Sequence, residues 1–132
     1  MRLAIVGSRN FTDYARMCYK INHTLQKWGK TIADIELIIS GGADGTDTMA
    51  ELFAAQYNIK TRIFLVDWKK FGKNAGPRRN TYIVNACSHM IAFPSIKGKG
   101  TQDSIKKAQK ASRTVEIAFV DAEHHNNQDV QL

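Results

Sequence analysis

The segment IISGGADGTD, from Ile38 to Asp47, carries three glycines and two carboxylates directly after a short apolar run. Glycine within regular structure costs roughly 0.5–1 kcal/mol relative to alanine, so this density of glycine indicates a backbone conformation that side chains would block. The segment predicts a buried strand that ends in a tight turn and leads into a helix. A sharp turn or a ligand lying against bare backbone would each explain the glycines, and the rest of the sequence decides between them.

Five short apolar segments predict five strands, at residues 3–7, 35–40, 61–66, 89–93 and 114–120. Their near-continuous apolar character is typical of strands that are covered on both faces of a parallel sheet. Apolar residues at helical spacing fill the gaps and predict four helices, around residues 14–28, 50–57, 77–84 and 105–108. The alternation predicts an α/β fold, a Rossmann-like doubly wound parallel sheet with helices on both faces.

The 132 residues are enough for one domain, which we expect at residues 1–120, followed by a polar and flexible tail at 121–132. No apolar run approaches the roughly 18 residues of a membrane span, and the first residues lack the pattern of a signal peptide. Cys18 and Cys87 are too few for a disulfide framework, so we expect reduced thiols in a cytoplasmic protein without a membrane partner. The His124–His125 pair has no matching ligand cluster, so no metal site is predicted.

The charge is unevenly distributed. The net charge is +7, and residues 60–113 contain thirteen lysines and arginines but only two acidic residues, Asp67 and Asp103. Such an excess favours anionic partners, namely phosphate esters, nucleotides or nucleic acid. A lysine-rich surface that only contacts solvent would give the same composition, so the charge alone does not decide.

Topology places the glycines of the first segment next to two other glycine-containing turns. In a doubly wound sheet of order 3-2-1-4-5, ligands bind beyond the carboxyl ends of the strands where the strand order reverses. The first, second and fourth strands are followed by GSRNF, SGGADGTD and FPSIKGKGT, and each turn leads into a helix whose first N–H groups favour anions. Their convergence predicts a phosphate site. Arg9 could clamp the anion, and Asp47 could cap the second helix or act as a carboxylate in the site.

Residues 67–80, DWKKFGKNAGPRRN, form a segment that is long for a strand-to-helix connection, which suggests a functional loop. We expect this loop to fold back over the crevice and to bring Lys73, Arg78, Arg79 and Asn80 towards the anion. Arg78 and Arg79 could instead be solvated residues at the start of a helix, although cations there oppose the helix dipole.

The motifs GSRNFTDY, SGGADGTD, DWKKFGKNAGPRRN and AFPSIKGKGT together resemble the SLOG superfamily, specifically its small stand-alone YspA/YpsA-related branch. The resemblance covers nearly the whole chain to about Val120 and implies a Rossmann-like fold that commonly forms homo-oligomers through helices beside the sheet. It implies no cofactor. It also implies which residues line the ligand pocket: Gly7, Ser8, Arg9, Gly41, Gly42, Asp47, Arg79, Asn80, Gly98, Gly100 and Thr101.

The resemblance leaves three functions open, because SLOG proteins include phosphoribohydrolases, the single-strand-binding DNA-processing protein A and sensor domains. The hydrolases carry a PGGxGTxxE signature whose glutamate is catalytic, and here that position falls on Ser104. We therefore favour a sensor or sequestering protein that binds a nucleotide or nucleotide-derived ligand. An N-glycosidase acting on nucleoside 5′-monophosphates, with Asp47 as its carboxylate, is one alternative. A single-strand nucleic-acid binder is the other, with Trp68, Phe71 and the surrounding lysines as its stacking platform, although Trp68 could equally lie in the core.

Overall fold

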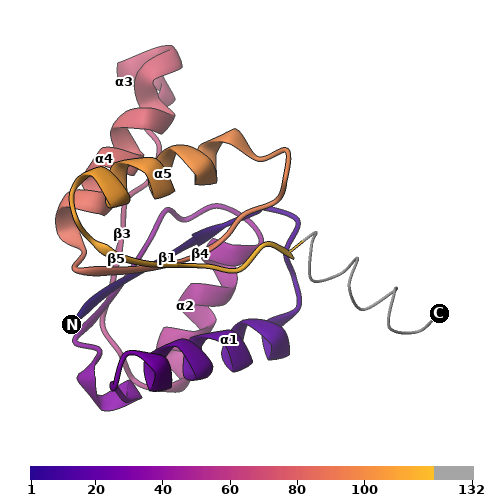
Figure 1. Ribbon diagram of the computed structural model, residues 1–132. Coiled ribbons are helices and arrows are strands. Elements are labelled where there is room, and N and C mark those ends of the chain that lie inside the picture. Colours follow the sequence, from indigo (N-terminus) through magenta and orange to yellow (C-terminus); the bar gives the residue numbers. More distant parts are fainter. Residues whose placement is uncertain (121–132) are drawn as a thin grey trace.

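The computed structural model describes residues 1–120, and the predicted tail at 121–132 lies outside them. The centre of the described part is a five-stranded parallel sheet of order β3-β2-β1-β4-β5 (Figure 1). Its strands are β1 (Arg2–Gly7), β2 (Leu37–Ser40), β3 (Thr61–Ile63), β4 (His89–Phe93) and β5 (Thr114–Ile117). The predicted fold class and strand order are confirmed.

Helices cover both faces of the sheet. Helices α1 (Tyr14–Lys27) and α2 (Thr46–Gln56) lie on one face, and α4 (Ala75–Ala86) and α5 (Lys99–Lys110) lie on the other (Figure 1). Successive side chains of a strand point to opposite faces. Leu3 and Ile5 of β1 accordingly join the core under α1 and α2, whereas Ala4 and Val6 join the core under α4 and α5. Because both faces are buried, the strands read as continuous apolar runs.

Strand β3 is shorter than the predicted strand at residues 61–66. Its residues pair with β2 through Ile38↔Thr61, Ile39↔Arg62 and Ser40↔Ile63. The Phe64 amide still donates to the Ser40 carbonyl oxygen (2.9 Å), but β2 ends at Ser40, where the chain turns away. The following residues therefore have no neighbouring strand to pair with, and β3 remains a short, exposed edge. Strand β2 also begins later than predicted, after a 3-10 turn, η1 (Ile32–Asp34).

The segment at residues 67–80 is not the loop that its length suggested. It contains a short helix, α3 (Trp68–Phe71), then a 3-10 turn, η2 (Gly72–Asn74), and then the first turns of α4. The Asp67 side chain starts α3 by accepting a hydrogen bond from the Lys70 amide (3.0 Å). Figure 1 shows α3 projecting beyond the layer formed by α4 and α5.

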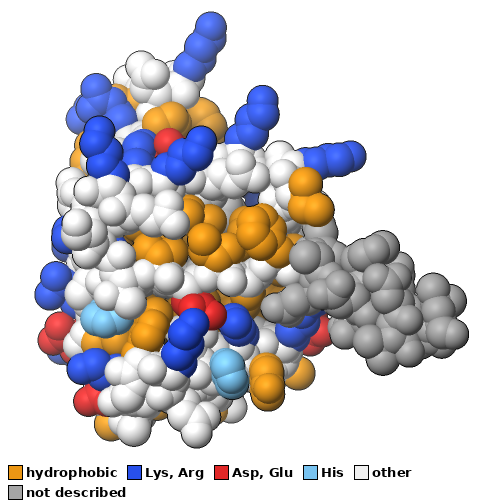
Figure 2. Space-filling model, in the orientation of Figure 1, with side chains coloured by type: hydrophobic (Ala, Val, Ile, Leu, Met, Phe, Trp, Pro, Cys, Tyr) orange, Lys and Arg blue, Asp and Glu red, His pale blue; other side chains and the backbone are white. Residues whose placement is uncertain are grey.

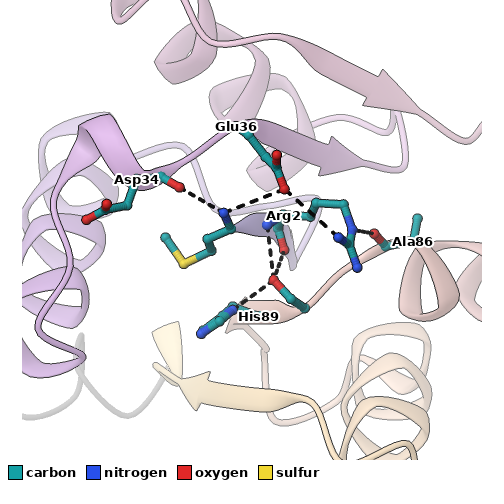
Figure 3. A network of polar contacts seen from close by, with 7 residues as sticks. Arg2, Asp34, Glu36, Ala86 and His89 are labelled. Carbon is teal, nitrogen blue, oxygen red and sulfur yellow. Dashed lines mark hydrogen bonds and ion pairs between the residues drawn. The ribbon is translucent and has the colours of Figure 1, made fainter.

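A network of polar contacts joins the amino-terminal ends of β1 and β4 (Figure 3). The Ser88 hydroxyl accepts a hydrogen bond from the Arg2 amide (3.0 Å) and donates to the Arg2 carbonyl oxygen (3.2 Å). The Arg2 Nε donates to the Ala86 carbonyl oxygen (2.7 Å), and the amino group of Met1 donates to the Asp34 carbonyl oxygen (2.9 Å). At this end of the sheet, polar groups are satisfied by other groups of the protein.

Candidate functional site

A cavity of about 340 Å³ lies beyond the carboxyl ends of β1, β2 and β4. This volume is within the range of small-molecule sites, roughly 300–1,000 Å³. All of the predicted pocket residues except Gly42 line it: Gly7, Ser8, Arg9, Gly41, Asp47, Arg79, Asn80, Gly98, Gly100 and Thr101. The sequence reasoning missed other lining residues: Val6, Asn10, Ala43, Ile83, Ser95 and Ser104.

The turn after β1 is packed against the start of α2. The Ser8 carbonyl oxygen accepts hydrogen bonds from the Thr46 amide (3.1 Å) and the Thr46 hydroxyl (2.9 Å). Gly45 has a φ of +70°, and a Cβ atom there would lie 2.3 Å from the Arg9 carbonyl oxygen. Only glycine fits this close approach of two backbone segments. Gly45 therefore serves the turn itself, and the same turn forms one wall of the cavity.

Gly42 does not line the cavity, although the family resemblance implied it. Gly42 is exposed and has a φ of +72°, and a Cβ atom there would lie 2.5 Å from Cδ2 of Leu65. The turn therefore directs Gly41 towards the cavity and Gly42 towards the segment that follows β3. Gly42 is needed for the turn rather than for the cavity wall.

Asp47 lies in the first turn of α2 and is only 6% exposed. Its Oδ2 atom accepts a hydrogen bond from the Ala43 amide (3.1 Å), so the carboxylate braces the turn after β2. The cap of α2 is Gly45, which corrects the expectation that Asp47 caps this helix. Burial raises the pKa of the Asp47 carboxyl group, and the Ala43 hydrogen bond and the charge of Arg79 only partly oppose this shift.

Arg79 and Asn80 reach the cavity from α4. The Arg79 Nη1 donates to the Gly41 carbonyl oxygen (2.8 Å), and its Nε donates to Oδ1 of Asn80 (3.1 Å). The Asn80 Nδ2 donates to the Gly100 carbonyl oxygen (3.2 Å) and to Oδ2 of Asp103 (3.0 Å). Two acceptors on one side fix the Asn80 amide so that its oxygen faces the guanidinium. Arg79 is thereby held in place from two directions.

The charges around the cavity are predominantly positive. Burial lowers the pKa of the Arg79 guanidinium, the charge of Asp47 partly restores it, and the like charge of Arg9 lowers it further. Asp47 is the one carboxylate among the residues that line the cavity within the described chain. An anion placed between Arg9 and Arg79 would relieve the repulsion between them.

Lys73 and Arg78 do not line the cavity, contrary to expectation. The Arg78 guanidinium lies 4.5 Å from the centre of the Phe71 ring, and Lys73 is exposed in η2. Because Arg78 and Arg79 are successive residues of one helix, they point in directions about 100° apart. The helix can therefore present only one of them to the cavity.

The third wall is formed by the start of α5. The cap residue Gly98 offers no side chain to the first amides of this helix. Ser104, in the second turn, is 2% exposed and lines the cavity. A serine hydroxyl thus occupies the position where the hydrolase signature has its glutamate. Within residues 1–120 there is no group of three or more His, Cys, Asp or Glu that could hold a metal ion, and no helix long and apolar enough to cross a membrane.

The family model described as "YspA, cpYpsA-related SLOG family" matches residues 1–71, which is more than half of the chain. The chain belongs to this family. The matched region of this SLOG protein includes the turns after β1 and β2, with Arg9 and Asp47. Gene 61 protein of Mycobacterium phage D29 is 29% identical over 116 residues, covering 83% of this chain and 90% of the phage protein.

Two solved structures share the fold of this SLOG protein. DNA processing protein A from Streptococcus pneumoniae superposes with a TM-score of 0.69 and 22% identity over 97% of this chain and 56% of that one. DNA processing protein A from Helicobacter pylori, whose structure describes a single-stranded DNA binding mode, gives a TM-score of 0.64 and 20% identity over 89% and 64%. At these identities the similarity shows the fold alone. The chain spans less than two thirds of either protein.

Proposed function

We propose that this SLOG protein binds a phosphate-bearing nucleotide or nucleotide-derived ligand in the cavity, in a sensor or sequestering role and without turnover. One observation carries the proposal. Arg9, which follows β1, and Arg79, in α4, both line a small cavity that is also lined by residues at the starts of α2 and α5. Helix starts and arginine guanidinium groups both commonly bind phosphate in proteins.

The two arginines are suited to different parts of this task. Arg79 is half-buried and held by Gly41 and Asn80, so it offers a fixed donor that loses little freedom when a ligand binds. Arg9 is exposed and can move towards an incoming phosphate. Val6 and Ile83 also line the cavity, but they are only 5% and 1% exposed and offer little apolar surface. The two arginines therefore support a phosphate-bearing ligand.

We expect no cleavage of a bound nucleotide because the cavity, as far as residues 1–120 form it, lacks the pair of carboxylates that such a reaction generally uses. Cleavage of a glycosidic bond passes through an oxocarbenium-like transition state and generally uses a pair of acidic groups. Here the cavity wall of the described chain has Asp47, which already braces the turn at Ala43, and Ser104 at the glutamate position. A single carboxylate with a structural hydrogen bond is poorly placed to act as nucleophile or base.

An N-glycosidase remains the second candidate, because a buried carboxyl group with a raised pKa in a cavity is also what a general acid requires. Chromatography of purified protein incubated with AMP, CMP, GMP and their deoxy forms distinguishes the two candidates. We expect no free base. Base release that is lost in Asp47→Asn, while folding and nucleotide binding persist, would establish the glycosidase instead, because the amide keeps the shape of the carboxyl group but cannot donate its proton as a general acid.

The binding proposal is tested by a thermal-shift panel of nucleoside mono-, di- and triphosphates, with free nucleosides and inorganic phosphate as comparisons. A ligand that binds only the folded protein raises the melting temperature, and the stabilisation grows with the logarithm of the ligand concentration relative to its dissociation constant. We expect a shift with at least one nucleotide and none with the matching nucleoside. A panel in which nucleosides act as well as nucleotides would exclude the phosphate site.

A further inference from the structure

A second surface lies outside the cavity and exposes aromatic rings. It is formed by residues 62–65, α3, η2 and the first turns of α4, and we refer to it as the α3 surface. Trp68 is 58% exposed, Tyr82 is 45% exposed and Leu65 is 72% exposed. The half-buried Phe64 ring lies against Tyr82, with centroids 6.2 Å apart. So many large exposed apolar side chains in one short region indicate a site of interaction.

The same surface is strongly basic. Residues 62–78 contain five lysines and arginines and a single acidic residue, Asp67, whose side chain is occupied as the cap of α3. Figure 2 shows lysine and arginine side chains beside hydrophobic ones at the end of the molecule where Figure 1 places α3. The α3 surface therefore carries a net positive charge that its own residues leave uncompensated.

Cations and rings alternate within the α3 surface. The Arg62 guanidinium lies 4.7 Å from the Phe64 ring centre, and the Arg78 guanidinium lies 4.5 Å from the Phe71 ring centre. Lys70 lies 5.2 Å from the same Phe71 ring. Each contact positions a charge next to a flat ring, so a polyanion and its bases can be contacted at the same time.

We propose that the α3 surface binds a single strand of nucleic acid. Single strands are held by basic residues that follow the phosphates and by aromatic side chains on which unpaired bases stack. A duplex keeps its bases stacked internally and would leave Trp68 without a partner. An apolar protein partner would use the rings but would not require the surrounding positive charge.

The α3 surface begins beside the cavity but is distinct from it. Gly41 lines the cavity, whereas the adjacent Gly42 faces Leu65 of the α3 surface. Likewise Arg79 reaches the cavity while Arg78 lies over Phe71. The inference therefore does not depend on the proposed nucleotide site, and the two can fail separately.

Fluorescence anisotropy with a labelled oligo(dT) of about twelve nucleotides tests the inference. We expect Trp68→Ala to weaken binding by about 5- to 150-fold, the range for one lost base-stacking contact. The matched control is Tyr19→Ala, because Tyr19 is a ring of α1 on the opposite face of the sheet and is 71% exposed. This control should leave the affinity unchanged.

A salt titration supplies a second readout. Removing one lysine that contacts phosphate reduces the slope of log affinity against log salt concentration by about 0.7 for a single strand. We expect this reduction for Lys69→Ala and for Lys73→Ala, and none for Lys110→Ala at the end of α5. All of these side chains are exposed, so the variants should fold.

Three results would overturn the inference: no anisotropy change with the intact protein, equal affinities for Trp68→Ala and Tyr19→Ala, or a duplex that binds as well as the single strand. If Trp68→Ala changes the sedimentation of the protein but not oligo(dT) binding, the α3 surface is a contact between copies of this chain. If a nucleotide still raises the melting temperature of the protein in any of these cases, the proposal of a nucleotide site in the cavity stands.

Discussion

The two ends of the sheet use arginine in opposite ways. At the amino-terminal end, Arg2 donates to the Ala86 carbonyl oxygen and lies 3.9 Å from a carboxylate oxygen of Glu36. At the carboxyl end, Arg9 and Arg79 repel each other beside Asp47. Charges that are compensated by the protein hold the fold together, whereas like charges gathered around a cavity need an outside partner. For this reason we place the proposed binding site at the carboxyl end.

The largest effect is expected from the turn that builds the cavity wall. Gly45→Ala should lower the free energy of unfolding by about 3 kcal/mol or more, because the new Cβ atom would meet the Arg9 carbonyl oxygen at a strained φ. Chemical denaturation measures this change. Gly100→Ala is the control, since a Cβ atom there has no neighbour within 4 Å, and it should be neutral or slightly stabilising. Equal stabilities for the two variants would contradict the close approach.

The second effect concerns the fixed arginine. Arg79→Met should weaken nucleotide binding by about 1–3 kcal/mol, because it removes a charge-assisted donor and leaves the Gly41 carbonyl oxygen unpaired. Arg78→Ala, one residue earlier on α4, should bind the same mononucleotide with unchanged affinity. If Arg78→Ala lost affinity as strongly as Arg79→Met, general charge rather than the cavity would explain the binding.

The third effect is a pH dependence of opposite sign at two carboxylates. Burial raises the pKa of Asp47, so the folded state holds its proton more tightly than the unfolded state, and this contribution to stability is lost as the pH rises above about 3.8. The free energy of unfolding of Asp47→Asn should therefore rise, relative to that of the native protein, as the pH increases from acid to neutral. Denaturant titrations across this range measure the difference.

Glu116 on β5 provides the comparison for Asp47. Burial alone would raise its pKa, but hydrogen bonds from Lys27 and Lys20 outweigh burial and lower it. Its contribution to stability is present above the pKa of the unfolded chain and is lost as the pH falls through the lowered value. The free energy of unfolding of Glu116→Gln should accordingly fall, relative to that of the native protein, as the pH rises. If this difference in stability changed with pH in the same direction for both variants, the assigned environments of the two carboxylates would be contradicted.

The smallest effect is expected at the amino-terminal end. Arg2→Ala removes an exposed ion pair and a hydrogen bond, so it should cost about 1 kcal/mol of stability and leave nucleotide affinity unchanged. Calorimetry and denaturation of the same preparation test both parts. A loss of affinity in this variant would remove the distinction between the two ends of the sheet.

The sequence predicted the centre of the sheet well because β1, β2 and β4 are buried on both faces. An apolar run such as the one ending at Gly7 reflects this burial, and the glycines mark the turns that follow. The cavity wall could be predicted as far as backbone turns determine it. Arg9 and Gly41 are examples, since both directly follow a strand.

Features that depend on side-chain direction could not be predicted. The sequence places Arg78 and Arg79 in one motif, and only the helical phase of α4 separates their directions. The cap of α2 was missed because the N-cap residue is Gly45, which has no side chain, and not Asp47 as expected. Edge strand β3 was predicted too long because its length depends on where β2 ends. These features follow from packing between elements rather than from local pattern.

The phosphate site in the cavity can be tested by isothermal titration calorimetry of the native protein and of Arg9→Ala with one nucleotide from the thermal-shift panel. Arg9 lines the cavity from an exposed position, so its removal should leave the fold intact. We expect saturable binding to the native protein, and Arg9→Ala should weaken it by about 1–3 kcal/mol. Unchanged affinity in Arg9→Ala would contradict the assignment of a phosphate site to this cavity.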